Sequence, residues 1–315
     1  MKKSIDNNFL LKVLEEAVLK AGDFALNFTK KKEEFCFWEK NKTTGTDGYK
    51  KEKSLVSTID FKVQKIITDY ISDKVSDTSN LGLLAEEQDA ELKKFNVNNI
   101  FTPGKYTILI DPIDGTANYC QRFLNNGKPS AKHNFWSVSV ALLNGKETIG
   151  GIIYYPALKK LLLKTCKGHG LWLNKKRIFL DNYLENFKPN NPIRVSGTIK
   201  DSFRKNFKYI PEYGSFTVSF LGLLKGGIRN SKIYIPELNC IPKIKAYIGK
   251  NIDILDLGCC ELAYIEAGGE IFDKELNSIS MFDHLDRFHH QFIIRKSFVM
   301  TSSNKYASKL INFYT

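Results

Sequence analysis

The sequence predicts a mixed α/β (α+β) protein, and three observations lead to that class. Apolar residues recur at helical spacing between Phe9 and Phe28. Between Phe135 and Leu173 the pattern alternates and is interrupted by glycines, which favours a set of antiparallel strands. The third observation is a repeated arrangement in which a short apolar run ends in a carboxylate, at Glu86, Asp111 and Asp256.

Further helices follow the first one along the chain. A second helix begins near Asp60, with Thr58 or Asp60 available as its cap. Ser215 caps a later helix that Gly226-Gly227 stops, and an apolar run leads Asp256 into another helix.

The polar segment 181–192 is the best candidate for a domain boundary. We therefore expect an N-terminal α+β half, residues 1–185, with the antiparallel sheet and a metal loop. A C-terminal α/β half, residues 186–315, should carry Asp256, the late aspartate of the pattern.

The richest motif is the run from Asp111 to Thr116, directly after the apolar strand Tyr106–Ile110. Asp111 and Asp114 are three residues apart across a proline-stiffened turn, where both carboxylates can face one point. Such oxygen ligands suit Mg²⁺ better than zinc or copper. Gly115 leaves room for a ligand, and its N–H and that of Thr116 can point at a phosphate if a helix starts here.

Taken alone, Asp-Pro and Asp-Gly pairs are ordinary turn chemistry. The wider pattern makes the difference, because Glu86 and Glu87 lie upstream and Asp256 lies downstream, each at the end of an apolar run. Glu87 is the less certain of its pair, since a solvated carboxylate explains it equally well.

In these motifs the chain resembles the inositol monophosphatase family of magnesium-dependent, lithium-sensitive phosphatases. The matching segments run in the family's order from about residue 7 to about residue 273. They are the segments 55–60, 83–87, 111–116, 134–145, 150–156, 213–215 and 254–269.

The resemblance implies a layered αβαβα sandwich of the sugar-phosphatase type, two sheets flanked by helices, and hydrolysis of a small phosphate monoester with Mg²⁺. It implies metal ligands at Glu86, Asp111, Ile113 (through its carbonyl), Asp114 and Asp256. It assigns catalytic roles to Glu86, Thr116 and Asp60, with Asp60 keeping the Thr116 hydroxyl aimed at the attacking water. It implies substrate contacts at Asp114, Gly115, Thr116, Gly214, Ser215 and Asp256.

Two departures from the family pattern bear on the substrate. The tryptophan before the late aspartate is Leu255 here, and the inositol-preferring members have a glutamate at the position of Gly249. A 3′(2′),5′-bisphosphate nucleotidase is therefore an alternative, and a fructose-1,6-bisphosphatase or histidinol-phosphate phosphatase ranks lower. From another class, the chain could be a catalytically silent, phosphate-binding regulatory protein, although such a protein has no need for the full set of site carboxylates.

Composition fits one intracellular enzyme. The net charge of +13 comes from dispersed lysines, so we expect a small phosphorylated substrate and no nucleic-acid partner. No run is long enough to span a bilayer, and the first residues lack the apolar region of a signal peptide. The six cysteines show no metal-ligand spacing and are expected to be reduced thiols. We expect a cytoplasmic protein that forms a homodimer and binds no membrane.

Overall fold

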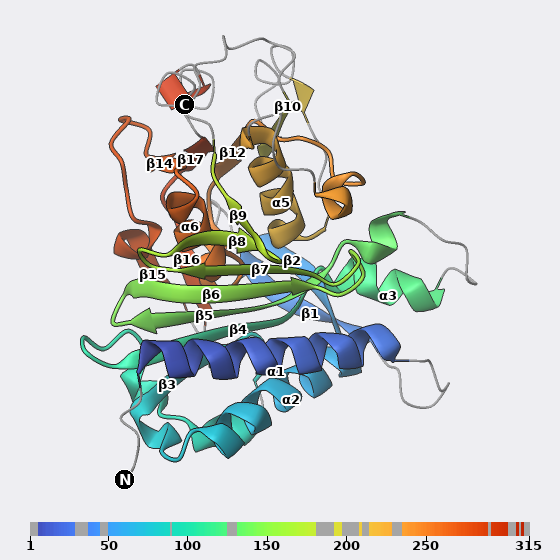
Figure 1. Cartoon of the computed structure of the whole chain (residues 1–315), viewed down its shortest axis with the longest axis vertical. Helices are drawn as coiled ribbons and strands as arrows, with labels where there is room; N and C mark the ends of the chain where they lie inside the picture. The colour runs from blue at the N-terminus through green and yellow to red at the C-terminus, as the bar shows by residue number, and fades with distance from the viewer. Residues whose placement is uncertain are drawn as a thin grey trace.

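A computed structural model describes residues 6–28, 37–44, 50–88, 90–124, 131–180, 192–196, 208–209, 214–228, 235–288, 291–301, 307–308 and 310–311. Within these ranges lie five α-helices (Figure 1): α1 (Asn7–Asn27), α2 (Thr58–Lys74), α3 (Thr116–Leu124), α5 (Phe216–Gly227) and α6 (Ile254–Glu266). None of them is long and apolar enough to cross a membrane.

The largest sheet has seven strands in the order β3-β4-β5-β6-β7-β8-β9. Its strands are β3 (Leu81–Ala85), β4 (Tyr106–Asp114), β5 (Ser137–Asn144), β6 (Glu147–Tyr155), β7 (Leu161–Cys166), β8 (Gly170–Leu173) and β9 (Lys176–Ile178). The β3 and β4 strands are parallel, and every later neighbour pair is antiparallel. The antiparallel arrangement expected between residues 135 and 173 is thereby confirmed.

The central strands of this sheet are buried on both faces. Along β4, Ile108 and Ile110 belong to the core under α1 and α2, whereas Leu109 belongs to the core on the opposite face. Because side chains alternate between the two faces along a strand, a strand that contributes to both cores needs an almost continuous apolar run. The Tyr106–Ile110 segment has that composition, and its strand therefore delivers Asp111 to a fixed place.

Three smaller sheets complete the fold. A five-stranded sheet has the order β11-β10-β12-β17-β14, from β10 (Pro192–Val195), β11 (Lys208–Tyr209), β12 (Ala246–Gly249), β14 (Glu270–Phe272) and β17 (Phe298–Thr301). A three-stranded sheet joins β13 (Ile252–Asp253), β16 (Gln291–Ile294) and β15 (Leu285–Phe288). A separate antiparallel hairpin contains β1 (Phe37–Thr44) and β2 (Lys50–Ser57).

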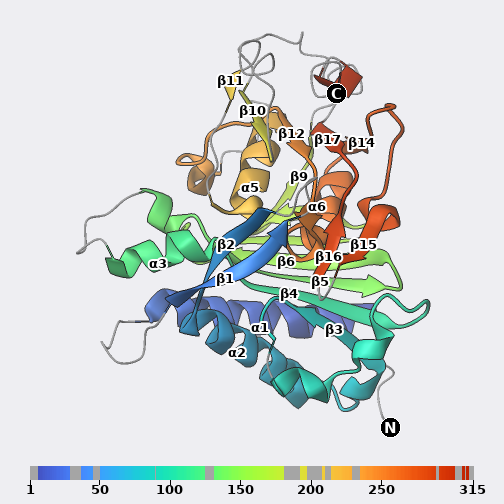
Figure 2. The ribbon, with the colours of Figure 1, turned by 180° about the vertical axis from the view of Figure 1, so that it is seen from behind.

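The layers alternate between helices and sheets. In both views α1 and α2 lie side by side along one face of the seven-stranded sheet, while α5 and α6 lie between that sheet and the five-stranded one (Figures 1 and 2). A third apolar cluster joins the five-stranded sheet to the helical residues Ala307, Leu310 and Ile311. The predicted αβαβα sandwich is confirmed.

Some local expectations need correction. The N-cap of α2 is Ser57 and not Thr58 or Asp60, because the Ser57 hydroxyl accepts from the Ile59 N–H. The carboxylate of Asp60, three residues later, accepts a hydrogen bond from the Ser57 N–H, which completes a capping box. Most of the expected boundary segment, 181–191, lies outside the described residues.

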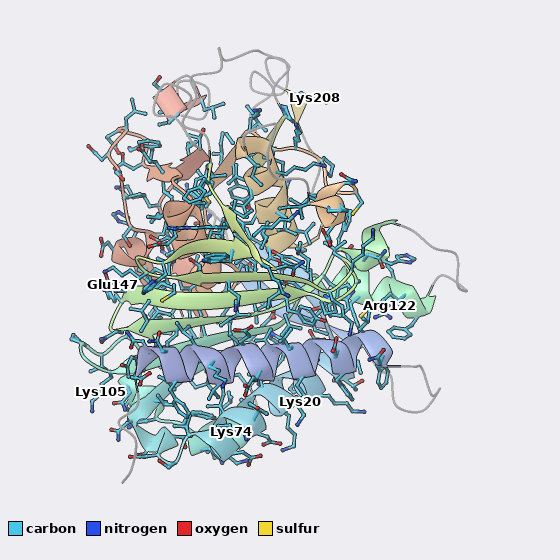
Figure 3. The ribbon with its side chains drawn as sticks, viewed as in Figure 1. Lys20, Lys74, Lys105, Arg122, Glu147 and Lys208 are labelled. Carbon is cyan, nitrogen blue, oxygen red and sulfur yellow. The ribbon has the colours of Figure 1, made fainter. Side chains whose placement is uncertain are left out.

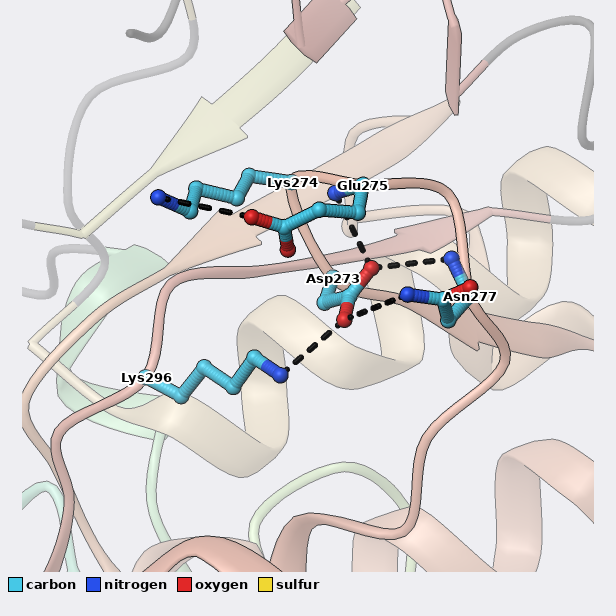
Figure 4. Close-up of polar contacts among 5 residues, drawn as sticks. All are labelled: Asp273, Lys274, Glu275, Asn277 and Lys296. Carbon is cyan, nitrogen blue, oxygen red and sulfur yellow. Dashed lines mark hydrogen bonds and ion pairs between the residues drawn. The ribbon is translucent and has the colours of Figure 1, made fainter.

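The turn after β14 is built on one buried carboxylate (Figure 4). The Asp273 carboxylate accepts from the N–H groups of Glu275 (3.0 Å) and Asn277 (2.8 Å) and from Lys296 Nζ (3.0 Å). Burial opposes ionisation of Asp273, but the bonds from Lys296 and Asn277 outweigh it and lower the pKa to about 2. This residue thus ties the segment leading to β17 onto the β14 turn.

The basic side chains are spread over the surface. Figure 3 shows Lys20, Lys74 and Lys105 around the α1/α2 layer and Lys208 at the opposite end of the molecule. Lys20 and Lys74 each lie 5.5 Å from the ring centroid of Tyr70. The labelled cations therefore form no single basic face in the part of the chain that is described.

Candidate active site

A bulge in β4 aims two carboxylates at one point. Asp111 lies opposite Ser139 and Asp114 lies opposite Ser137, so three steps along β4 correspond to two steps along β5. In a regular strand, residues three apart point to opposite faces, and the extra residue cancels that difference. The expected turn is in fact the bulged end of the strand, but its consequence is the predicted one.

Asp256 completes the cluster from α6, which packs on the seven-stranded sheet. It lies in the first turn of α6, after the Asp253 N-cap. Asp111, Asp114 and Asp256 each offer a carboxylate oxygen, and these three oxygens lie within 4.8 Å of one another. Two oxygens bound to the same Mg²⁺ at about 2.1 Å can be at most about 4.2 Å apart, so the set fits such an ion after a small adjustment.

The Asp114 carboxylate also caps α5. Its Oδ2 accepts from the Thr217 N–H (2.7 Å) and the Ser215 hydroxyl (2.7 Å), and its Oδ1 accepts from the Phe216 N–H (3.1 Å). Burial raises the pKa of Asp114, and these hydrogen bonds oppose the rise. Asp114 therefore joins the end of β4 to the N-terminus of α5.

Behind Ser215 lies a chain of buried hydroxyls. Ser215 Oγ is 3.3 Å from Thr217 Oγ1, which is 2.7 Å from Ser137 Oγ. Because Ser215 donates to Asp114, all three contacts are hydrogen bonds at the same time when Ser137 donates to Thr217 and Thr217 donates to Ser215. The three hydroxyls thus form a buried polar connection between β5 and Asp114.

Thr116, the first residue of α3, is held by α2. Its hydroxyl lies 2.9 Å from Asp60 Oδ1 and 3.0 Å from the Ile113 carbonyl oxygen. Since one hydrogen serves only one acceptor at a time, an ionised Asp60 attracts it and leaves the Ile113 carbonyl available to another partner. Burial, with a smaller contribution from the charge of Glu86, raises the pKa of Asp60 to about 7.

Two glycines let the backbones meet beside the carboxylates. Gly115 has φ +93°, and a Cβ there would lie 2.7 Å from the Phe135 carbonyl oxygen and 3.0 Å from Ser215 Cβ. Gly214 has φ +71°, and a Cβ there would lie 3.2 Å from Asn118 Nδ2. Both conformations favour glycine, so the N-termini of α3 and α5 approach each other here.

Glu86 and Glu87 follow β3 directly. Glu86 is half-buried, and its charge acts on Asp60, which places it on the Thr116 side of the cluster. Glu87 is 3% exposed, so of its two explanations the solvated carboxylate is excluded. The backbone of Glu87 pairs with the side chain of Gln64 on α2.

The structure thus brings Asp111, Asp114 and Asp256 around one point, and Thr116 and Asp60 are joined to the same stretch of β4 through the Ile113 carbonyl. Ser215 bonds Asp114, and Gly115 lies against Ser215 and Gly214. The sequence reasoning missed Ser57, Gln64, Ser137 and Thr217. The spacing of Ser57 and Asp60 is a capping-box signal that would have identified Ser57. Gln64 lies one helical turn after Asp60, and its position on the same face was the only signal for it.

A family model described as the inositol monophosphatase family matches residues 8–203. An inositol monophosphatase of Dictyostelium discoideum is 32% identical over 231 residues, which cover 71% of this chain and 74% of that protein. A fructose-1,6-bisphosphatase/inositol-1-monophosphatase of Aquifex aeolicus is 32% identical over 150 residues, 48% of this chain and 46% of that protein. The chain thus spans about half of the Aquifex relative's length and about three quarters of the Dictyostelium one.

Solved structures agree in fold at low identity. The extragenic suppressor protein suhB of Bartonella henselae aligns with a TM-score of 0.62 and 18% identity over 97% of this chain and 98% of its own. A Thermotoga maritima IMPase aligns with a TM-score of 0.61 and 19% identity over 98% and 97%. With its motifs brought together in this fold and the family model matching well over half of its length, the chain belongs to the inositol monophosphatase family, whose members are phosphatases that hydrolyse phosphate esters.

Proposed function

We propose that this protein hydrolyses a small phosphate monoester with Mg²⁺ as cofactor. The observation that carries the proposal is the meeting of Asp111, Asp114 and Asp256 within 4.8 Å, beside the N-termini of α3 and α5. Buried carboxylates attract a divalent cation, and backbone N–H groups at a helix start attract a phosphate. The Phe216 and Thr217 N–H groups of α5 already donate to Asp114, so the start of α3 is the place proposed for the phosphate.

In this proposal Asp111, Asp114, Asp256, Glu86 and the Ile113 carbonyl hold the metal. Bound Mg²⁺ supplies neutralisation of the phosphate oxygens and of the leaving group. Burial raises the pKa of Asp114, which disfavours a charge that nothing balances, and a bound cation would reverse this effect.

Thr116, Asp60 and Glu86 orient the attacking water. The Thr116 hydroxyl donates to Asp60 and turns a lone pair outward, so it can accept a hydrogen bond from a water that Glu86 also contacts. The Asp60 carboxylate is held in place by hydrogen bonds from the Ser57 N–H at 2.8 Å and the Ser57 hydroxyl at 2.6 Å, so its position does not change when the water moves. The rigid pair therefore sets the direction of attack.

The phosphate lies against the N–H groups of Gly115 and Thr116, and the organic part of the substrate lies near Gly214, Ser215 and Asp256. What supports this arrangement is the start of α3 at Thr116, two residues after the cluster residue Asp114.

A second candidate substrate class is a 3′(2′),5′-bisphosphate nucleotide. At Gly249 a Cβ would lie 2.4 Å from Phe298 Cζ and 2.7 Å from Ile252 Cδ1. The glutamate that inositol-preferring members have here does not fit beside that ring, so inositol recognition of the usual kind is disfavoured. Fructose 1,6-bisphosphate is retained because relatives carry that name.

The test is phosphate release from inositol 1-phosphate, adenosine 3′,5′-bisphosphate, fructose 1,6-bisphosphate and histidinol phosphate, with Mg²⁺ and with excess EDTA. We expect turnover of at least one compound, loss of that turnover in EDTA, and recovery with Mg²⁺ but no need for zinc. Equal rates in EDTA would overturn the metal mechanism. No turnover of any compound, with Mg²⁺ still bound, would favour the silent phosphate-binding protein.

Lithium provides an independent check on the Asp256 side of the site. Millimolar Li⁺ is expected to inhibit, as the family resemblance implies. We further propose a cytoplasmic homodimer, to be checked by light scattering of the purified protein and by fractionation of the cells that produce it.

A further inference from the structure

One buried side chain on α2 is built to hold the backbone of the Glu86–Glu87 turn. Gln64 is 1% exposed, and its Nε2 donates to the Glu87 carbonyl at 2.6 Å while its Oε1 accepts from the Glu87 N–H at 3.1 Å. Only this orientation of the amide pairs donors with acceptors, since the flipped one would set two donors face to face. The two bonds act like one rung of a sheet ladder.

The neighbouring residue is held from the opposite side. The Glu86 N–H donates to the Ile110 carbonyl at 3.2 Å, which continues the β3–β4 ladder one step beyond Ala85. The turn is therefore fixed to β4 through Glu86 and to α2 through Glu87. With the backbone fixed at both residues, the freedom left to the half-buried Glu86 carboxylate is rotation of its own side chain.

The same helix, α2, also holds the Thr116 hydroxyl, through Asp60. Gln64 lies four residues after Asp60, so both side chains leave one face of α2 about one turn, or roughly 5.4 Å, apart. Asp60 binds the Thr116 hydroxyl, and Gln64 binds the turn that carries Glu86. The α2 helix thus spaces the two groups that the proposed function assigns to the attacking water.

We infer that Gln64 is a positioning residue of the phosphatase site, which fixes where the Glu86 carboxylate meets the metal and the water. The inference rests on the proposed function. A merely structural Gln64 would also lower stability when replaced, but it would leave metal affinity and turnover of the folded protein unchanged.

The test compares Gln64→Met and Gln64→Glu with Thr68→Val. The methionine variant keeps the length and removes both bonds, whereas the glutamate variant keeps an acceptor for the Glu87 N–H and removes the donor to its carbonyl. Thr68 lies one turn further along α2 and is 1% exposed, and within the described residues its hydroxyl bonds only the Lys65 carbonyl of its own helix. It therefore reports the cost of disturbing α2 without reaching the site.

Two quantities are measured on each folded protein: Mn²⁺ affinity without substrate, from the EPR signal of free Mn²⁺, and kcat and KM at saturating Mg²⁺. We expect Gln64→Met to lose about 10- to 100-fold in Mn²⁺ affinity or in kcat, the range for residues that orient metal ligands, with KM changed less than about threefold. We expect Gln64→Glu to lose about 10-fold in kcat, because its carboxylate faces the Glu87 carbonyl.

Values for both Gln64 variants within about twofold of Thr68→Val would overturn the inference. If Gln64→Met does not fold, Gln64→Glu decides alone. If wild type and Thr68→Val release no phosphate from any panel compound, the proposed activity fails, and the Mn²⁺ affinities still decide the role of Gln64.

Discussion

At Asp114 a single carboxylate serves two partners, since it faces Asp111 and Asp256 and also accepts three hydrogen bonds from the start of α5. Replacement by asparagine removes the charge and turns an amide N–H₂ toward one of those donors. We expect Asp114→Asn to lose nearly all turnover and to lower the free energy of unfolding by about 1–3 kcal/mol. Activity assays and urea denaturation measure the two effects.

Asp256→Asn is the matched control. Asp256 is half-buried at the start of α6, where its charge favours the helix by only about 0.3–1 kcal/mol. We expect the same loss of turnover with a much smaller loss of stability. Equal stability losses in the two variants would contradict the capping role of Asp114.

Thr116 permits a test that separates hydroxyl chemistry from packing. Thr116→Ala removes the group that bonds Asp60, and we expect turnover to fall by roughly two to four orders of magnitude with metal binding intact. Thr116→Ser retains the hydroxyl and should keep turnover within about tenfold of wild type. Steady-state kinetics with Mg²⁺ titration measures both; an alanine variant as active as the serine variant would exclude Thr116 from the reaction.

At the scale of elements, α6 meets the 3₁₀ segment Met281–His284 through a buried carboxyl. Glu261 is 4% exposed, and its Oε1 accepts from the Met281 N–H at 2.8 Å. Burial raises the pKa of Glu261 from 4.5 to about 7, the charge of Asp283 adds to this, and the bonds from Met281 and Ser280 oppose it. Between about pH 4.5 and pH 7, Glu261 therefore holds a proton in the folded protein that it has released in the unfolded chain.

The stability contributed by protonated Glu261 is therefore complete below about pH 4.5 and is lost as the pH rises through about 7. In the wild type, Glu261 should lower the free energy of unfolding by on the order of 3 kcal/mol between pH 5 and pH 8. Glu261→Gln keeps an acceptor for Met281 and does not titrate, so we expect this part of the fall to be absent in the variant. Urea denaturation at both pH values measures it, with the exposed Glu270→Gln as control. An unchanged pH dependence would mean that Glu261 titrates normally.

The sequence predicted elements where one pattern dominates: the helical spacing of α1, the apolar run of β4 and the alternation in β5. It did not predict β1 and β2, because their polar, lysine-rich segments pair with each other and lack the alternation of a half-buried sheet. The α2 cap was placed one or three residues too late, at Thr58 or Asp60, since Ser57, Thr58 and Asp60 are all good capping residues. Only the tertiary contact of Asp60 with Thr116 shows why Asp60 points inward.

At the scale of the whole molecule, the proposed metal joins parts of the chain that are far apart in sequence. Asp111 and Asp114 end β4, and Asp256 starts α6 more than a hundred residues later. An ion bound only by the folded protein stabilises it by about 2.7 kcal/mol at 100 times its dissociation constant. We expect saturating Mg²⁺ to raise the melting temperature by roughly 3–6 °C relative to EDTA.

Calorimetry of wild type and Asp256→Asn checks this expectation without any substrate. The variant should lose most of the Mg²⁺-dependent rise, because one of the three carboxylates is gone. A full rise in the variant would place the ion elsewhere in the molecule.

The site was predictable to the extent that it lies in local motifs. Asp111, Asp114 and Thr116 fall within six residues, and Asp256 stands at a recognisable helix start. Gln64, Ser137 and Thr217 carry no such signal, because a glutamine on a helix or a hydroxyl on a strand is common and only the packing of α2, β5 and α5 gives each its partner. The division at residues 185 and 186 stays a prediction; one apolar cluster contains Leu109 from the first part and Ile244 from the second.

The shared carboxylate of Asp114 also bears on how such chains diverge. A descendant that abandoned catalysis would still need an acceptor for the Phe216 and Thr217 N–H groups, so purifying selection would retain Asp114 for folding alone. Asp256 places a favourable charge at the start of α6, an effect of about 0.3–1 kcal/mol, whereas an acceptor lost from two N–H groups costs about 1–3 kcal/mol for each group left unpaired, so selection for folding alone would hold Asp114 more strongly than Asp256. Among homologues, an aspartate at the position of Asp256 is therefore the better marker of retained catalysis. An aspartate at the position of Asp114 is a marker of the fold.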